Sequence, residues 1–208
     1  MTDSIDVRNA GDQRLPPGQI VTRKWPVLHY GRVPRVDPAQ WSFRIWGAVA
    51  TPVEWNWEQL QALPHQETLC DIHCVTRWSR YDNRFSGTPI RALLQSVQLH
   101  PDASHVLVHG EPDYTTNLPI SDLDRPENLL ATHHDGEPLT PEHGGPVRLL
   151  VPHLYFWKSA KWVTGFEVLE ADAPGFWEDN GYHMYGNPWA EQRFGRPDPV
   201  RMRRGPRE

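Results

Sequence analysis

Hydrophobic and polar residues alternate along several short stretches of the chain, with the period of two that is typical of a half-buried β-strand. In residues 41–49, for example, Trp41, Phe43 and Ile45 alternate with polar side chains. Further short stretches predict strands at residues 67–75, 105–110, 114–120, 146–152 and 161–170. The pattern therefore predicts a domain that is dominated by β-sheet.

Two other stretches predict short helices. Asn56 is the predicted N-cap of the stretch NWEQLQALP, and Pro64 ends that helix. In TPIRALLQSV, Thr88 is the predicted cap and Pro89 the first helical residue, and apolar residues follow with the period of an α-helix. Residues 85–89, FSGTP, have the composition of a turn. We therefore expect the α+β class, mostly β with a few short helices.

The distribution of polar residues predicts three segments. Residues 1–24 are polar and predict a flexible N-terminal arm, and the tail at 191–208 ends in the basic sequence RMRRGPRE. One domain is expected between them, at residues 25–190. It begins with KWPVLHYGRVPRVDP, which is interrupted by prolines and is expected to lie extended on the surface.

Composition and charge exclude some classes of protein. The chain has 208 residues, enough for one domain with a sizeable core, and its ten tryptophans add apolar area to a hydrophobic content of only 38%. The formal net charge of −5 gives no reason to expect a nucleic-acid partner. No stretch approaches the roughly 18 apolar residues of a membrane span, and no targeting signal is visible, so we expect a cytoplasmic protein.

Cys74, in the sequence DIHCVTRWS, is the first candidate for chemistry, since the chain has only two cysteines. On one strand Cys70 and Cys74 would lie roughly 13 Å apart, at about 3.3 Å per residue, which exceeds the limit of about 7 Å for a disulfide. A zinc site lacks a second Cys/His pair at matching spacing. His73 would point to the opposite face and could not activate a nucleophilic thiol. The residues alone favour a buried core thiol and leave zinc binding and nucleophilic catalysis open.

The sequence from Cys74 onward resembles the molybdopterin-binding domain of the sulfite oxidase family. Three segments, CVTRWS, FSGTPIRALL and GGPVRLLVPHLYFWKSAKWV, stand in the same order as in the bacterial methionine-sulfoxide reductase catalytic subunits. The resemblance extends from about Trp25 to Pro188. It implies the family's mostly β, mixed-sheet fold, a Mo-molybdopterin cofactor, and an oxidoreductase that transfers an oxygen atom or electrons. It also implies a small oxyanion or sulfoxide-type substrate and an unidentified electron-transfer partner.

The resemblance also assigns roles to individual residues. Cys74 is implied as the thiolate ligand of molybdenum, for which a soft sulfur donor is suitable, whereas Cys70 has no counterpart in the family. Arg148 matches the arginine of the cofactor site, and His143 stands where the bacterial reductases have asparagine. The loop that holds the cofactor phosphate in the family matches Ser159, Ala160 and Lys161.

Other residues have both a functional and a structural interpretation. His109 falls near a threonine that contacts the cofactor in the reductases, and His29 and Tyr30 match the segment that lies against the pterin. Tyr182, in GFWEDNGYHMYGNPW, matches a tyrosine near the metal of the sulfite oxidases. Packing alone explains these four residues equally well. Arg77 is a separate hypothesis that rests on its charge, because a basic residue close to Cys74 would help to bind substrate or pterin.

The sequence departs from the true sulfite oxidases in three respects. Leu28, His29 and Tyr30 replace their Arg-Asn-His segment, which weakens sulfite as the substrate. A haem domain and an immunoglobulin-like dimerisation domain are also missing, so we expect a monomer that passes electrons to or from a separate partner. The alternative function is a non-catalytic molybdopterin- or zinc-binding interaction module on the same fold.

Overall fold

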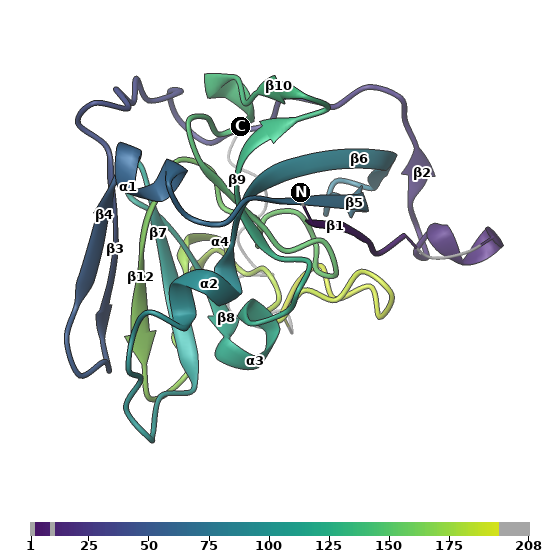
Figure 1. The fold of residues 1–208 in the computed structure, drawn as a ribbon. Helices are drawn as coiled ribbons and strands as arrows, with labels where there is room; N and C mark the ends of the chain where they lie inside the picture. The colour runs from purple at the N-terminus through teal and green to yellow at the C-terminus, as the bar shows by residue number, and fades with distance from the viewer. Residues whose placement is uncertain (1–2, 9–10, 196–208) are drawn as a thin grey trace.

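Two β-sheets form most of the fold in the computed structural model, which describes residues 3–8 and 11–195 (Figure 1). The larger sheet is built from seven strands: β1 (Asp3–Asp6), β2 (Ile20–Val21), β5 (Gln66–His73), β6 (Trp78–Pro89), β9 (Leu129–His134), β10 (Glu137–Pro138) and β11 (Arg148–Leu150). The smaller sheet is built from five strands: β3 (Ser42–Gly47), β4 (Val53–Asn56), β7 (His105–Gly110), β8 (Tyr114–Pro119) and β12 (Val163–Leu169). The helices of the described residues are all short: η1 (Gly11–Arg14), α1 (Trp57–Gln61), α2 (Ile90–Leu94), α3 (Ile120–Leu123), η2 (Pro141–His143) and α4 (Phe176–Asp179).

Both sheets are mixed, which confirms the expected α+β class with mostly β structure. In the larger sheet β5 and β6 form an antiparallel hairpin, β1 pairs in parallel with β5, and β2 pairs in parallel with β6. In the smaller sheet β12 pairs in parallel with β3 and antiparallel with β7. In Figure 1 the smaller sheet lies on the left and the β5–β6 hairpin extends to the upper right.

The core consists of two main clusters, on opposite faces of β9. Leu130 belongs to the first cluster, together with inward-facing residues of the smaller sheet and of α1 and α2. In that cluster Phe43 and Phe166 pack edge to face, with ring centroids 4.8 Å apart. Leu129 and Ala131 face the second cluster, with Phe85 of β6. Because side chains alternate between the faces of a strand, β9 contributes to both clusters and joins them.

The two predicted helices are present, but only one has the predicted cap. Asn56 caps α1 with a reciprocal capping box, since its side chain accepts from the Gln59 N–H and the Gln59 side chain accepts from the Asn56 N–H. The prediction of Thr88 as the cap of α2 is wrong. Thr88 lies buried on β6, where its hydroxyl donates to the Leu60 carbonyl, and α2 begins after Pro89 without a side-chain cap.

The turn predicted at residues 85–89 is also wrong, because these residues continue β6. Gly87 lies against β9, where a Cβ atom would come within 2.0 Å of the Leu130 carbonyl oxygen. The glycine therefore allows β9 to approach β6 closely, and a register shift between Ser86 and Gly87 marks the position. Glycine in a strand and glycine in a turn have the same local composition, which explains the error.

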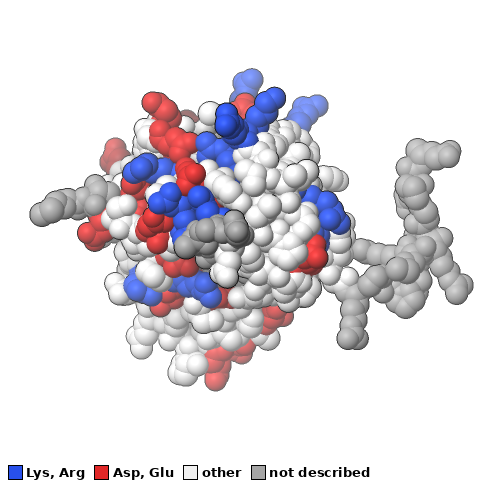
Figure 2. All heavy atoms as spheres, turned by 90° about the vertical axis from the view of Figure 1, so that its right-hand side faces the viewer, with Lys and Arg blue, Asp and Glu red and all other residues white. Residues whose placement is uncertain are grey.

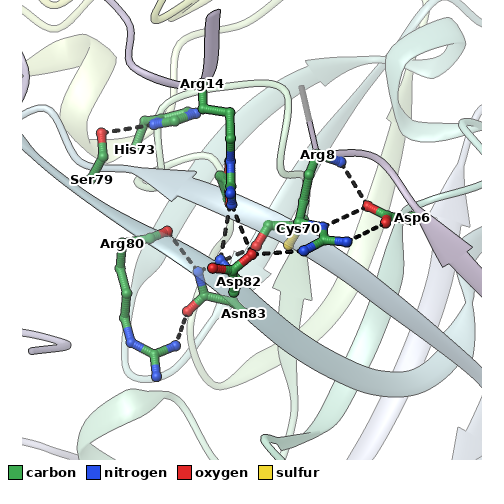
Figure 3. Close-up of polar contacts among 10 residues, drawn as sticks. Asp6, Arg8, Arg14, Cys70, His73, Ser79, Arg80, Asp82 and Asn83 are labelled. Carbon is green, nitrogen blue, oxygen red and sulfur yellow. Dashed lines mark hydrogen bonds and ion pairs between the residues drawn. The ribbon is translucent and has the colours of Figure 1, made fainter. Parts of the chain in front are cut away.

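The N-terminal segment is held against the larger sheet, in contrast to the flexible arm expected from its composition. Besides the pairing of β1 and β2, two arginines bind the outer side of the β5–β6 hairpin (Figure 3). Arg14 donates to both carboxylate oxygens of Asp71, at 2.8 and 2.5 Å, and to Asp82. Arg8 donates to Asp82 at 2.8 Å and also to Asp6. Local composition did not indicate the partners on the hairpin, because Asp71 and Asp82 are 57 to 74 residues away from these arginines in sequence.

Charges of both signs lie side by side on the face that carries this segment (Figure 2). Such a surface presents no broad field of one sign, which is consistent with the low net charge. Residues 196–208, most of the tail predicted at 191–208, lie outside the described residues, whereas Arg193 within that predicted tail is buried. Among the described residues, no helix is both long and apolar enough to cross a membrane.

The contact between Arg14 and Asp71 gives a prediction about stability. The Asp71 side chain is only 5% exposed, so replacing Arg14 with Ala leaves a buried carboxylate without its cation. We expect Arg14→Ala to lower the free energy of unfolding by about 2 kcal/mol, measured by urea denaturation. Arg23→Ala, at an exposed arginine nearby, is the matched control and should change stability by less than about 0.5 kcal/mol. Equal effects of the two substitutions would contradict the prediction.

Candidate active site

A cavity of about 580 Å³ lies at the turn between β5 and β6, and its size is suitable for a small organic molecule. Its wall is assembled from the segment before β3, the turn after β5, the tip of the β7–β8 hairpin, the loop after β11, and α4. The lining residues on which the argument below depends are Trp25, His29, Tyr30, Cys74, Trp78, Arg148, Trp157, Ser159, Ala160, Lys161, Trp177 and Tyr182. A smaller cavity of about 340 Å³ is lined from β5 by Cys70, Asp71 and His73 instead.

Cys74 begins the turn of the hairpin, directly after the last residue of β5. Its N–H donates to the Trp78 carbonyl and its carbonyl accepts from the Arg77 N–H, so the turn is closed from both sides. The sulfur lies 3.1 Å from the Thr76 hydroxyl oxygen, and burial raises the pKa of the Cys74 thiol while this hydroxyl opposes the shift. Both cysteines are free thiols, which confirms that they form no disulfide. Cys74 is therefore a fixed sulfur donor in the wall of the cavity.

The wall beside Cys74 is aromatic. Trp177 stacks on Tyr182 with ring centroids 4.9 Å apart, and Trp157 meets Tyr182 edge to face at 5.1 Å. The indole N–H of Trp157 donates to the Glu178 carboxylate at 2.8 Å, and Lys158 pairs with the same oxygen at 2.6 Å. Neither member of that ion pair is exposed, so it fixes the Trp157 ring firmly.

Sequence analysis missed the pair Lys158 and Glu178. Lys158 also donates to Asn117 and to the Met184 carbonyl, which ties the segment after α4 to the rest of the wall. The only signal was a second lysine in FWKSAK, three residues before Lys161. Strand periodicity could not separate the two, because the loop that carries them has no regular structure.

At another part of the cavity Arg148 is almost completely buried. Its two terminal nitrogens donate to the carbonyls of His143 and Ser159, at 2.8 and 2.7 Å, and its guanidinium lies 4.1 Å from the centre of the Phe156 ring. Burial lowers the pKa of Arg148 to about 9. The Nε atom has no hydrogen-bond partner among the described residues. Arg148 therefore retains one free donor in a site where it contacts no carboxylate.

Lys161 and the residues before it add further free donors. Lys161 Nζ donates to the carbonyls of Leu28 and Glu142, at 2.7 and 2.5 Å, and burial, reinforced by Arg148, lowers the pKa of Lys161 to about 7. Within the described part of the chain, the backbone N–H groups of Ala160 and Lys161 have no acceptor. Unpaired donors next to two cations form a site for an anionic group, such as a phosphate. The residues present therefore fit a cofactor that carries a phosphate.

The structure brings most of the sequence-predicted residues to this cavity, including His29 and Tyr30. The segment that carries these two has the expected extended, mostly exposed backbone, and the Tyr30 ring lies 5.1 Å from Phe176. His143 is absent from the lining, but its ring stacks on Trp25 at 4.0 Å, directly behind the wall.

Besides His143, two predicted residues do not line the cavity, and neither of them lies against its wall. His109 lies on β7, where its Nε2 is 2.9 Å from a Glu167 carboxylate oxygen, and it does not line the cavity. Arg77 is exposed and has a left-handed backbone, and its guanidinium approaches Gly18 on the outside of the turn. These positions give no support to a role in binding cofactor or substrate.

The alternative of a zinc site has no support in the described residues. No group of three or more His, Cys, Asp or Glu side chains among them could hold a metal ion. Cys70 and Cys74 line different cavities, and His73 lines the cavity of Cys70. Cys74 thus stands alone as a protein sulfur in its cavity.

Comparison with known proteins gives one family match and several similar chains. The family model described as the oxidoreductase molybdopterin binding domain matches residues 30–177. The "uncharacterized oxidoreductase YuiH" of Bacillus subtilis (strain 168) is 48% identical over 182 residues, which are 87% of this chain and 92% of that protein. The protein-methionine-sulfoxide reductase catalytic subunit MsrP of Gluconobacter oxydans (strain 621H) is 28% identical over 174 residues, covering 73% of this chain and 55% of that protein.

Among solved structures, the sulfane dehydrogenase SoxCD from Paracoccus pantotrophus is similar in fold. The TM-score is 0.64, with 20% sequence identity, and the match covers 69% of this chain and 41% of that chain. At this identity the similarity establishes the fold and carries no information about the reaction.

The buried cation Lys161 gives a prediction about pH. Below pH 7 the folded, cofactor-free protein holds a buried ammonium, and above its pKa of about 7 the folded protein releases a proton that the unfolded chain keeps. Stability should therefore rise with pH above 7, by up to about 1.4 kcal/mol per pH unit from this lysine. Urea denaturation between about pH 6.5 and 8.5 should show this slope in the wild type and lose it in Lys161→Met. Parallel stability curves for the two proteins would contradict the lowered pKa.

Proposed function

Because the chain belongs to the family of oxidoreductase molybdopterin-binding domains, and so to the sulfite oxidase family of molybdopterin enzymes, we propose that Cys74 is the protein ligand of its molybdenum. One observation carries this proposal: a single cavity presents the Cys74 thiol together with a cluster of unpaired donors around Arg148 and Lys161. A cofactor with a metal at one end and a phosphate at the other needs both of these features in one cavity.

The roles of the other residues follow from the groups that they present. Arg148 and Lys161 supply positive charge to the cofactor phosphate, and the backbone N–H groups of Ala160 and Lys161 donate to its oxygens. Ser159 supports this loop, since its hydroxyl oxygen accepts from the Val151 N–H at 2.9 Å. His29 and Tyr30 close the cavity over the cofactor. When bound, the cofactor supplies a two-electron redox change at molybdenum and the site of oxygen-atom or electron transfer.

The aromatic wall supports a neutral, sulfoxide-type substrate more than a small oxyanion. Trp157, Trp177 and Tyr182 pack around Cys74 and offer apolar area and ring faces to a substrate. Arg77, the cation proposed from the sequence to meet an anionic substrate, lies outside the cavity. An oxyanion would be desolvated against these rings without a paired cation beside the sulfur. The similarity to a methionine-sulfoxide reductase subunit supports the same choice.

A separate electron-transfer partner belongs to this proposal. Oxygen-atom transfer at molybdenum leaves two electrons to be supplied or removed before the next turnover, so the proposed reaction needs a second molecule as donor or acceptor. Leu28 and Tyr30, at the mouth of the cavity, are exposed, and a partner could approach the cofactor there.

The first test of the proposed function is the metal content of Cys74→Ser. Purified from a host that makes molybdopterin, the wild type should hold about one molybdenum per chain and show a visible thiolate-to-metal band that bleaches on reduction. Cys74→Ser should lose this band and most of the metal, because a neutral hydroxyl is a poor ligand compared with a thiolate.

Cys70→Ala is the matched control for this experiment. Cys70 is fully buried and does not line the cofactor cavity, so its variant should keep both the metal and the band. Zinc in the wild type, or molybdenum that is unaffected by Cys74→Ser, would overturn the assignment of the ligand. Zinc in the wild type would also favour the alternative function, a non-catalytic binding module on the same fold.

The substrate proposal predicts a specific effect of Trp177→Ala. Removing one ring of the aromatic wall should raise the KM for an aryl methyl sulfoxide about tenfold, with a reduced viologen dye as electron donor. Molybdenum content should stay near that of the wild type, because Trp177 contributes no thiolate, cation or backbone donor to the proposed cofactor site. Trp46→Ala is the control, since Trp46 packs on His109 outside the cavity. An unchanged KM, or turnover of sulfite but not of sulfoxides, would exclude this substrate class.

A further inference from the structure

Two side chains from opposite ends of the chain bind the backbone of the turn that carries Cys74. Gln19 Nε2 donates to the Cys74 carbonyl at 2.9 Å, and Arg193 Nη1 donates to the Val75 carbonyl at 2.7 Å. Gln19 is 9% exposed and Arg193 is 5% exposed, so both hydrogen bonds are buried. They hold two successive carbonyl groups, that of the Cys74–Val75 peptide and that of the Val75–Thr76 peptide, which fixes the backbone on both sides of Val75.

The two side chains also belong to one connected assembly. Arg193 Nη2 donates to the Pro17 carbonyl at 3.2 Å, and its guanidinium lies 4.9 Å from the centre of the Tyr155 ring. After Gln19, the Ile20 N–H donates to the Arg77 carbonyl at 2.9 Å. The segment before β2 therefore contacts the turn on one side and Arg193 on the other.

Gly18 makes this close packing possible. Its backbone has a positive φ of 68°, and a Cβ atom there would lie 2.6 Å from a Glu191 carboxylate oxygen and 3.2 Å from Arg193 and Arg77. Glycine tolerates both the left-handed backbone and the contact. The N-terminal segment and the residues around Arg193 are thus fitted to each other at the turn.

The direction of the Cys74 sulfur depends on the backbone of this turn. The turn is short and is closed by only two backbone hydrogen bonds, Cys74 N–H to Trp78 and Arg77 N–H to Cys74. A shift of the turn backbone at Cys74 would move the Sγ atom relative to the cavity, because the side chain follows its Cα atom. Ligand atoms of a metal site have to be held within about 0.5 Å by supporting contacts, so this shift has to be prevented.

We propose that Gln19 and Arg193 are positioning residues that fix the Cys74–Val75 backbone and thereby aim the Cys74 sulfur into the cofactor cavity. Both lie outside residues 30–177, the part that matches the family model, so this chain supplies the support from its own flanking segments. The inference rests on the proposed function, in which Cys74 is the metal ligand. It also makes a claim about the turn in the cofactor-free protein.

Gln19→Leu separates positioning from stability. The Gln19 Oε1 atom is buried without a partner among the described residues, and the Cys74 carbonyl keeps the Arg77 N–H as a donor. An apolar side chain of similar shape therefore leaves no new unpaired group, and the thermal midpoint should stay near that of the wild type. The turn, however, loses its side-chain support.

The experiment measures Cys74 in two states of the protein. In a cofactor-free Cys70→Ala background, iodoacetamide should alkylate Cys74 about three- to tenfold faster in Gln19→Leu, which is the factor that one hydrogen bond contributes to local opening. In the molybdenum-loaded protein the visible thiolate-to-metal band should shift or broaden while the metal remains bound. Arg193→Met should show the same two changes, independently of its effect on the thermal midpoint.

Gln40→Leu and Arg23→Met are the matched controls, since both residues are exposed and neither side chain bonds to the turn in the described structure. Unchanged alkylation rates and an unchanged band in both turn variants would overturn the positioning role, while loss of molybdenum in Cys74→Ser would leave the proposed function in place. Conversely, if Cys74→Ser keeps its molybdenum, the proposed function fails. The alkylation rate in the cofactor-free protein then still decides whether Gln19 holds the turn.

Discussion

The antiparallel pairing of β5 with β6 is the constraint on which the rest of the structure depends. The pairing runs from Gln66 opposite Gly87 to His73 opposite Ser79, and Cys74 follows at its end. Successive residues of a strand face opposite sides, so this register directs His73 to the smaller cavity and leaves Cys74 at the larger one. β9 pairs with β6 and also with β11, so the loop after β11, which lines the cavity, is anchored to the hairpin that carries the cysteine.

The buried cations in and behind the cavity wall differ in their partners: Lys158 pairs with a carboxylate, whereas Arg148 and Lys161 bond only to carbonyl groups. Lys158 is fully buried but pairs with Glu178 at 2.6 Å, and it holds the aromatic wall in place. Arg148 is 1% exposed and bonds only to carbonyl groups, so burial lowers its pKa to about 9. A cation that is desolvated without an anion costs stability, and such a cost is typical of a binding site. Arg148 and Lys161 therefore indicate where the anionic end of a cofactor belongs, and Lys158 does not.

Features that depend on neighbours in sequence could be predicted, whereas features that depend on distant partners could not. The strand at 41–49 and the Asn56 cap follow from a few adjacent residues, and both are present. Thr88 and Gly87 carry the local signature of a cap and a turn, but pairing with β9 places both inside a strand. The N-terminal segment was expected to be flexible from its polar composition, and its anchor could not be predicted because Asp71, which binds Arg14, is 57 residues away.

The same distinction applies to the candidate site. The resemblance supplied Cys74, Arg148 and the loop with Lys161, because the order of motifs can be recognised even in loops, where no strand or helix periodicity exists. It could not supply Gln19 or Arg193, which flank the matched region and act on the turn through backbone carbonyls.

The tryptophans complete the site. The indole N–H of Trp162 donates to the Pro141 carbonyl, whereas that of Trp78 is buried with no partner in the described structure. A wall of fixed rings with polar edges is suited to a flat heterocycle whose faces are apolar and whose edges form hydrogen bonds, which is the chemistry of a pterin.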